Sequence, residues 1–238
     1  MKTFKNFTIS KEIFDAFPGM KLIVVIARNI DNSIIRPAIS TELTKAWAAA
    51  GDAALEYGNP QSHPRVKAWV DHFKAIGVSR KKFPSSIEAL IRRASKDDKP
   101  VSINPMVDFY NTISLKYVVT AGGYDIDQLE NGLDLRFSRQ GDTFQALDDP
   151  EPIPIPEGEV SYAEGSHIVT RHFIWRQSKI GLVHPESKNV LLLSEIPALL
   201  GEELYLNVMT SLIEGVKTHF QVTPDFYTMD SGNLKISI

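Results

Sequence analysis

The chain contains no cysteine. This absence excludes disulfide bonds, thiolate nucleophiles and zinc sites built on thiolates. Long hydrophobic runs are also missing: the longest extends from Leu22 to Ala27, whereas a membrane-spanning helix needs about 20 apolar residues. Near the N-terminus, Lys2 and Lys5 are not followed by the apolar segment of a secretory signal peptide. We therefore expect a cytoplasmic protein without membrane contact.

A surplus of positive charge is absent as well. The formal net charge is −3, which argues against a general nucleic-acid coat protein, because such a protein needs Lys and Arg to neutralise phosphates. The sequence has no Ser-His-Asp order around a nucleophile elbow and no phosphate-binding glycine loop. We predict no metal and no other cofactor, because the following histidines lack metal-ligand spacing with carboxylates: His63, His72, His167, His184 and His219.

The composition that remains is that of a soluble globular protein, with 238 residues, 43% hydrophobic and 23% charged. This length fits one domain spanning 1–238. We expect a helical part in 1–100, a core with the polar motifs in 101–195, and a closing helix and strand in 196–238. Helical patterns come first and short strands follow Asp125, including one predicted from Phe173 to Trp175. This order favours an α+β fold over a doubly wound parallel sheet.

One predicted helix, in the stretch from Ser102 to Leu129, carries more polar groups than a core helix needs. These groups are Asn104, Asp108, Asn111 and Ser114. They are either the polar wall of a pocket or helix caps and hydrogen bonds to backbone, which Asn, Asp and Ser commonly form. For Asn104 we favour an N-cap, because Pro105 follows it and proline suits the first helical position.

A Gly122-Gly123 pair follows this helix, ahead of Tyr124 and Asp125. Glycine lets a ligand come close to the backbone, and free N–H groups there can hold a carbonyl or an oxyanion. The alternative is a tight turn with positive φ, which we favour slightly.

Three polar groups and an indole occur within seven residues: Arg171, Trp175, Arg176 and Gln177. The Arg176 fork suits a phosphate or a carboxylate, and Trp175 can stack on a base or an aromatic amino acid. Equally, the arginines could pair with Asp108 or Asp125 and the Trp could belong to the core. His172 has a pKa suited to a general base, but we favour a surface position for it.

The strongest basic patch lies in the helical part. It consists of Arg80, Lys81, Lys82, Arg92 and Arg93. Such a group can steer RNA toward a pocket, although a solvated helix face is the more common explanation.

Several motifs, taken in order, resemble a known family. Asn104 to Asp108 with Asn111 resembles the "INxVVDxTNY" segment of the B3/4 domain, the editing domain of the bacterial phenylalanyl-tRNA synthetase β chain. The segments around Tyr124-Asp125, Leu133 to Asp148 and Pro185 to Leu192 resemble later motifs of that domain. Free-standing proteins built on the domain are more similar still, with "SSxEALxRR", "GGYD" and "WRQS", found here from Ser85, Gly122 and Trp175 onward.

This resemblance implies a B3/4-type fold, with a β-sandwich-like mixed sheet core flanked by helices. It also implies a trans-editing protein that binds aminoacyl-tRNA and hydrolyses the ester of a mischarged amino acid. In that case Asn111, Gly122 and Gly123 would lie at the reacting carbonyl. The substrate would be held by Asn104, Asp108, Ser114, Asp125, Arg171, Trp175, Arg176 and Gln177.

Two departures from the synthetase pattern stand out. The synthetase domain has a His where this chain has Gly122, and a Glu that recognises the tyrosine hydroxyl where this chain has Leu193. Leucine cannot read a hydroxyl, so Leu193 argues against tyrosine as the mischarged amino acid. The alternatives are a non-catalytic module that binds tRNA, a free amino acid or another small ligand, and a small-molecule enzyme on the same scaffold.

Overall fold

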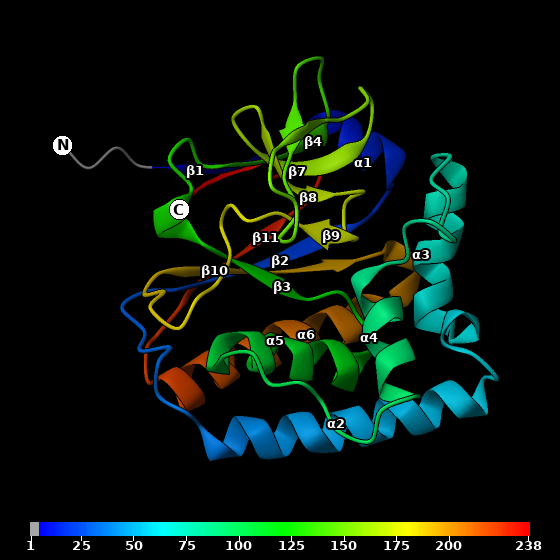
Figure 1. Ribbon diagram of the computed structural model, residues 1–238, viewed down its shortest axis with the longest axis vertical. Coiled ribbons are helices and arrows are strands. Elements are labelled where there is room, and N and C mark those ends of the chain that lie inside the picture. Colours follow the sequence, from blue (N-terminus) through cyan, green and yellow to red (C-terminus); the bar gives the residue numbers. More distant parts are fainter. Residues whose placement is uncertain (1–4) are drawn as a thin grey trace.

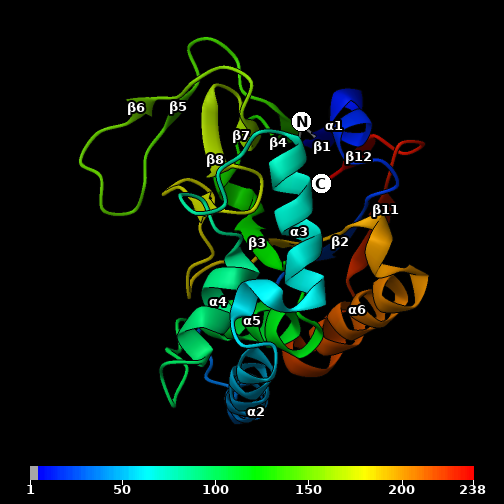
Figure 2. The ribbon, with the colours of Figure 1, turned by 90° about the vertical axis from the view of Figure 1, so that its right-hand side faces the viewer.

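The computed structural model describes residues 5–238, and within them the strands form two sheets packed face to face. Helices cover the outer face of the smaller sheet. Figures 1 and 2 show the resulting order of layers: the larger sheet, the smaller sheet, a pair of helices, and one long helix across the end of the molecule.

The larger sheet is mixed, in the order β12-β1-β4-β7-β8-β5-β6, with β9 paired to β8. The pairs β1–β4 and β5–β8 are parallel and the others antiparallel. The strands are β1 (Asn6–Ile9), β4 (Leu133–Phe137), β5 (Thr143–Phe144), β6 (Ile153–Pro154), β7 (Val160–Glu164), β8 (His167–Arg171), β9 (Arg176–Gln177) and β12 (Lys235–Ser237).

The smaller sheet is antiparallel throughout, in the order β11-β2-β10-β3. Its strands are β2 (Lys21–Ala27), β3 (Gly122–Asp125), β10 (Val190–Ile196) and β11 (Asp225–Met229). Alternate side chains of β10 enter different cores: Leu193 packs with residues of the larger sheet, and Leu192 packs with residues of the helices. Both faces of this sheet are therefore buried, which explains why β2 and β10 are almost continuously apolar.

All helices except α1 form the layers below the smaller sheet or flank one end of it, and α1 lies beside β4 of the larger sheet (Figure 1). Helices α5 and α6 lie against the sheet and α2 lies below them, while α3 and α4 follow α2 along one side. Their bounds are α1 (Lys11–Ala16), α2 (Pro37–Glu56), α3 (Pro64–Ala75), α4 (Ser86–Ala94), α5 (Pro105–Tyr117) and α6 (Glu202–Gly215), which continues into a π-helical turn (Val216–Phe220).

A buried ion pair fixes the turn after β4. The Arg136 guanidinium donates to both carboxylate oxygens of Asp142, at 2.6 and 3.1 Å, and to the carbonyl of Gly165 at 2.8 Å. Arg136 is 2% exposed and Asp142 3%, so removing either partner would leave an uncompensated charge in the interior.

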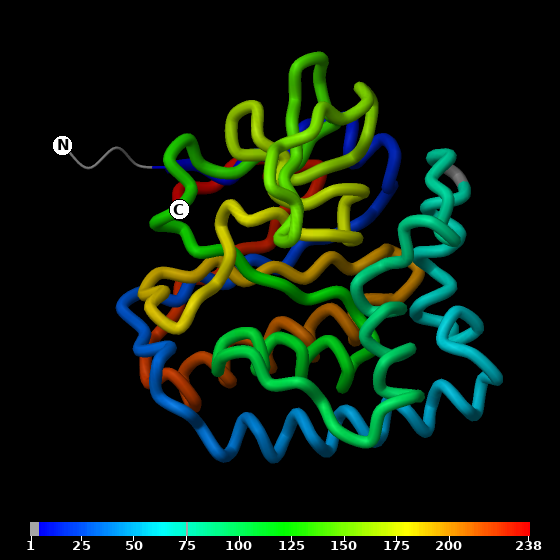
Figure 3. The backbone as a smooth tube through the Cα atoms, in the orientation of Figure 1, coloured from blue at the N-terminus to red at the C-terminus, as the bar shows by residue number. Residues whose placement is uncertain are grey.

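The predicted fold class is confirmed: the chain is α+β with a sandwich-like core and a mainly helical first half. Two local predictions were incomplete or wrong. Strands β1 and β12, from opposite ends of the chain, pair antiparallel and extend the larger sheet (Figure 3). The strand predicted from Phe173 to Trp175 is instead a turn, because His172 and Phe173 have φ of 44° and 64°, outside the extended region.

In the described range, no helix is long and apolar enough to cross a membrane. Residues 5–238 also hold no group of three His, Asp or Glu side chains arranged to bind a metal ion.

Candidate functional site

A cavity of about 180 Å³ lies beside β3, the edge strand of the smaller sheet. Its walls come from α5, β3, β7, β8, β10, the turn before β9 and the start of α4. The lining residues are Ser86, Tyr110, Asn111, Thr120, Ala121, Gly122, Gly123, Tyr124, Tyr162, Thr170, Phe173, Ile174, Trp175, Gln177, Leu193 and Glu195.

The three residues that we assigned to the reacting carbonyl all line this cavity. The favoured turn at the glycines is wrong: Gly122 and Gly123 lie in β3, where they pair with Leu193 and Leu192 of β10, and neither has positive φ. A Cβ on Gly122 would meet no protein atom within 4 Å. The glycine at 122 therefore keeps a space open in front of the strand backbone.

The backbone N–H of Gly123 points to the free edge of β3. Gln177 Nε2 donates to the carbonyl of Gly123 at 3.2 Å, and the N–H of Asp125 donates to the carbonyl of Gly181 at 2.9 Å, both on the side away from β10. In an antiparallel strand, the N–H and C=O of one residue point to the same side. The Gly123 N–H is thus directed away from β10, at the edge that borders the cavity.

Helix α5 contributes two side chains with unused hydrogen-bonding capacity. Asn111 and Tyr110 line the cavity, and within residues 5–238 neither the Asn111 amide nor the Tyr110 hydroxyl forms a hydrogen bond. Burial raises the pKa of the Tyr110 phenol, so this group stays protonated and able to donate. Together with the Gly123 N–H they give the cavity a set of uncommitted donors.

A buried carboxyl group also lines the cavity. Glu195 of β10 accepts hydrogen bonds from the Tyr162 hydroxyl at 2.5 Å and from the Thr120 hydroxyl at 2.6 Å. Burial raises the pKa of Glu195, and the two hydrogen bonds only partly oppose this effect. Close by, the Tyr124 hydroxyl and Thr170 Oγ1 are 2.6 Å apart.

Sequence reasoning missed Glu195, and its argument from Leu193 was incomplete. Leu193 does occupy the position facing Gly122, but Glu195 lies two residues farther along the same strand and brings a carboxyl group into the cavity. The available signal was an acidic residue near the end of the otherwise apolar run from Val190 to Ile196. Such a residue in a buried strand needs a polar partner or a function.

The turn between β8 and β9 forms the rim of the cavity. It is held against α4, because the Ser86 N–H donates to the carbonyl of Ile174 at 2.8 Å. Two predicted binding residues on this hairpin, Trp175 and Gln177, line the cavity. The left-handed backbone at His172 and Phe173 is the kind of local strain that a binding site can retain.

The two predicted binding arginines point elsewhere. Arg171 pairs with buried Glu159, with 2.7 Å between Nη2 and Oε2. Arg176 is exposed and lies 3.6 Å from a carboxylate oxygen of Asp148. Neither pairs with Asp108 or Asp125, the partners that we considered, and neither lines the cavity.

His172 is not on the surface as we favoured. Its side chain is 11% exposed, its ring lies 3.7 Å from that of Phe83 between centroids, and neither ring nitrogen has a hydrogen-bond partner. Burial lowers the pKa of His172 to about 4; the Glu159 carboxylate opposes this effect and Arg171 adds to it. The imidazole is therefore neutral at physiological pH.

Two predicted binding residues at the start of α5 have structural partners. Asn104 Oδ1 accepts from the N–H of Val107 at 3.1 Å, which confirms the predicted N-cap. Asp108 accepts from the N–H of Ile103 at 2.9 Å. Both side chains border a different cavity, of about 230 Å³, at the starts of α2 and α5.

The other two, Ser114 and Asp125, also bond within the fold. Ser114 Oγ donates to the carbonyl of Ala121 at 3.3 Å. Asp125 accepts from the Ser187 hydroxyl at 2.6 Å and from the N–H of Asp127 at 2.9 Å. These contacts hold the chain just before β3 and at its end.

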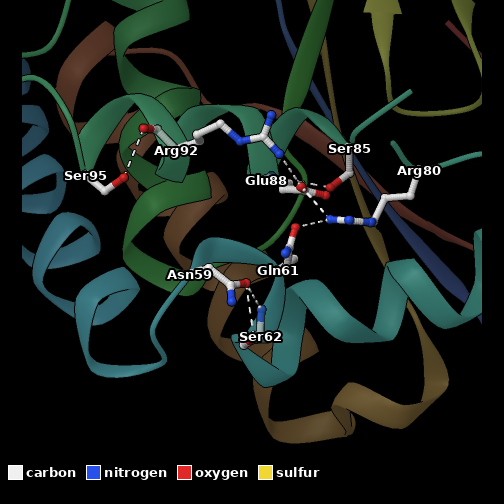
Figure 4. A network of polar contacts seen from close by, with 8 residues as sticks. All are labelled: Asn59, Gln61, Ser62, Arg80, Ser85, Glu88, Arg92 and Ser95. Carbon is white, nitrogen blue, oxygen red and sulfur yellow. Dashed lines mark hydrogen bonds and ion pairs between the residues drawn. The ribbon is translucent and has the colours of Figure 1, made fainter. Parts of the chain in front are cut away.

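Two residues of the basic patch pair with buried Glu88. Arg80 and Arg92 both donate to Glu88 Oε1, at 2.8 and 2.6 Å, and Arg80 also contacts Gln61 (Figure 4). These two arginines therefore neutralise a buried carboxylate. The exposed remainder of the patch consists of Lys81, Lys82 and Arg93.

The family model for the B3/4 domain matches residues 68–202, more than half of the chain. The protein therefore belongs to the B3/4 domain family, as its motifs predicted. Among solved structures, it is similar to an N-terminal fragment of the phenylalanyl-tRNA synthetase β-subunit from Pyrococcus horikoshii, with 11% identity and a TM-score of 0.45. That match covers 94% of this chain and 51% of the fragment, so the chain spans about half the fragment's length. No curated protein matches the sequence.

Proposed function

We propose that this chain is a trans-editing protein that binds the aminoacyl end of a mischarged tRNA and hydrolyses its ester bond. The observation that carries the proposal is the set of uncommitted donors in one cavity: the Asn111 amide, the Tyr110 hydroxyl and the N–H at the β3 edge. Donors of this kind hold the charge that develops on a carbonyl oxygen during acyl transfer.

Hydrolysis of this ester needs little help from a side-chain base. Water adds to the ester carbonyl carbon, the Gly123 N–H and a donor from α5 hold the oxyanion, and the bond to the ribose oxygen then breaks. One proton of the water passes to the ribose oxygen, so the tRNA recovers its hydroxyl, and the other is released to solvent as the amino acid leaves as a carboxylate. An aminoacyl ester is already activated, so positioning of the water and the carbonyl supplies most of what the reaction needs.

The volume of the cavity is suited to one end of a large substrate and is too small to enclose the whole of it. A volume of about 180 Å³ is smaller than the roughly 300–1,000 Å³ of pockets that enclose drug-sized ligands. The amino acid would enter, and the terminal adenosine would remain at the rim beside Trp175. Exposed Lys81, Lys82 and Arg93 would contact phosphates farther along the RNA.

A binding module without turnover is the second candidate. It is favoured by the lining itself, which contains no histidine. Such a module would hold aminoacyl-tRNA in the same way and leave the ester intact.

A deacylation assay with a panel of correctly and wrongly charged tRNAs separates the two. We expect one mischarged species to lose its amino acid faster with the wild-type protein, and Asn111→Ala to lose most of this effect. Tyrosine belongs in the panel, because Glu195 restores an acidic group to the cavity. An exposed Asn207→Ala variant on α6 is the matched control. No acceleration with any species, by folded protein, would refute editing and leave the binding module.

A further inference from the structure

The side chains that line the cavity include an acid but no base. Of the side chains that line it, only Glu195 is an acid, and none is Arg, Lys or His. Of the two arginines that flank the lining segment, Arg171 pairs with Glu159 and exposed Arg176 lies near Asp148, and neither lines the cavity. A negative group on a ligand would therefore find no cationic partner here.

Glu195 itself has only neutral partners. Its two oxygens each accept one hydrogen bond from a hydroxyl group, those of Tyr162 and Thr120. A carboxylate oxygen has room for a second donor. A buried carboxylate with no cation is costly, so a positively charged donor from a ligand would gain more here than a neutral one would.

Glu195 and the open space at Gly122 lie on the same face of the smaller sheet. Leu193 faces Gly122 across the strand pair, and residues two apart on a strand share a face. The Thr120 hydroxyl bonds to both the side chain and the carbonyl of Glu195, at 2.6 and 3.2 Å. The acid thus borders the place where Gly122 and Gly123 would receive a carbonyl group.

An amino acid carries its ammonium group on the carbon next to that carbonyl. In an ester or amide the ammonium is the only charge of the backbone part, whereas a free amino acid adds a carboxylate. Burying that carboxylate beside Glu195, without a cation, is unfavourable.

We propose that Glu195 is a specificity-determining residue that receives the α-ammonium group, so that the cavity accepts amino acids blocked at the carboxyl group and rejects free amino acids. The inference rests on the proposed function, whose substrate class it specifies. It also explains product release, because hydrolysis gives the amino acid a carboxylate that the cavity does not accept.

Three probes that share one side chain test this without an ester or a tRNA. They are an L-amino acid amide, the free L-amino acid, and the N-acetyl amide, measured by calorimetry for each of the common side chains. We expect the best-binding amide to bind at least about tenfold more tightly than the free amino acid or the N-acetyl amide with the same side chain. This ratio corresponds to a difference of about 1.4 kcal/mol in binding free energy. This comparison uses only the wild-type protein.

Glu195→Gln keeps the shape of the side chain and removes its charge. We expect it to lower the affinity of the amide about tenfold or more and to leave the affinity of the N-acetyl amide unchanged. Glu186→Gln, in an exposed turn, is the matched control.

Three results would overturn the inference. One is that no amide binds more tightly than its free amino acid. Another is that Glu195→Gln leaves the amide affinity unchanged. The third is that Glu195→Gln removes only a preference for tyrosinamide over phenylalaninamide, which would show that Glu195 reads a side-chain hydroxyl. Because no ester is present, these outcomes are independent of whether the deacylation assay succeeds.

Discussion

The adjacent glycines of β3 allow one methyl group to be added on either face of the same strand. At Gly122 the new Cβ would meet no protein atom within 4 Å, and φ is not in the left-handed region. Gly122→Ala should therefore keep the native stability or gain up to about 1 kcal/mol, because alanine restricts the unfolded chain.

At Gly123 the same methyl group enters the core. Its Cβ would lie 3.2 Å from Leu192 Cδ2, 3.3 Å from the carbonyl oxygen of Leu191 and 3.4 Å from Val190 Cγ1. The carbonyl belongs to β10 and cannot move without disturbing the strand pairing. Overpacking of this kind costs about 1–3 kcal/mol, so Gly123→Ala should lower the free energy of unfolding by that amount.

The effect on activity should not follow the effect on stability, because Gly122→Ala should keep its stability and lose activity. The Gly122→Ala methyl group occupies the space in front of the β3 backbone, where the reacting carbonyl is proposed to lie. We expect kcat/KM for ester hydrolysis to fall at least tenfold, or about 1.4 kcal/mol, in a protein that unfolds at wild-type denaturant concentration. A stable Gly122→Ala protein with full activity would refute the placement of the substrate. Greater destabilisation at Gly122 than at Gly123 would refute the assignment of the two faces.

Three further predictions concern the same site and its surroundings. Asn111→Ala should reduce ester hydrolysis by about 10²-fold, as loss of an oxyanion donor does, with little change in tRNA affinity in a filter-binding assay; equal loss of both would make Asn111 a binding residue. The folded pKa of Glu195 is above its ordinary value of 4.5, so its contribution to stability is present at low pH and is lost as pH rises through the folded pKa. Glu195→Gln should therefore gain stability relative to wild type as pH rises above 4.5 in denaturant titrations, and a constant difference would contradict this. Changing Lys81, Lys82 and Arg93 together to Glu should weaken tRNA binding and reduce its dependence on salt; unchanged affinity would exclude this surface.

Local patterns in the sequence determined the helices and the family. Pro105 after Asn104 predicted the start of α5, and in the structure Ser85 caps α4 through a side-chain hydrogen bond within the same helical turn. These features depend on neighbours within one helical turn, so the sequence displays them directly. The ordered motifs identified the B3/4 family for the same reason, because each is a contiguous string.

Tertiary structure decided the partners of the polar side chains. Glu195 meets Tyr162 and Thr120, which are 33 and 75 residues away in the chain, and no local window contains all three. The Gly122-Gly123 pair fits a turn when considered alone, but pairing with β10 makes it an extended edge strand. Charges behave in the same way: the sequence allows either a ligand or an acidic side chain as the partner of Arg171, and the fold places Glu159 beside it. The sequence identifies each polar side chain, whereas its hydrogen-bond and ion-pair partners depend on which distant segments the fold brings together.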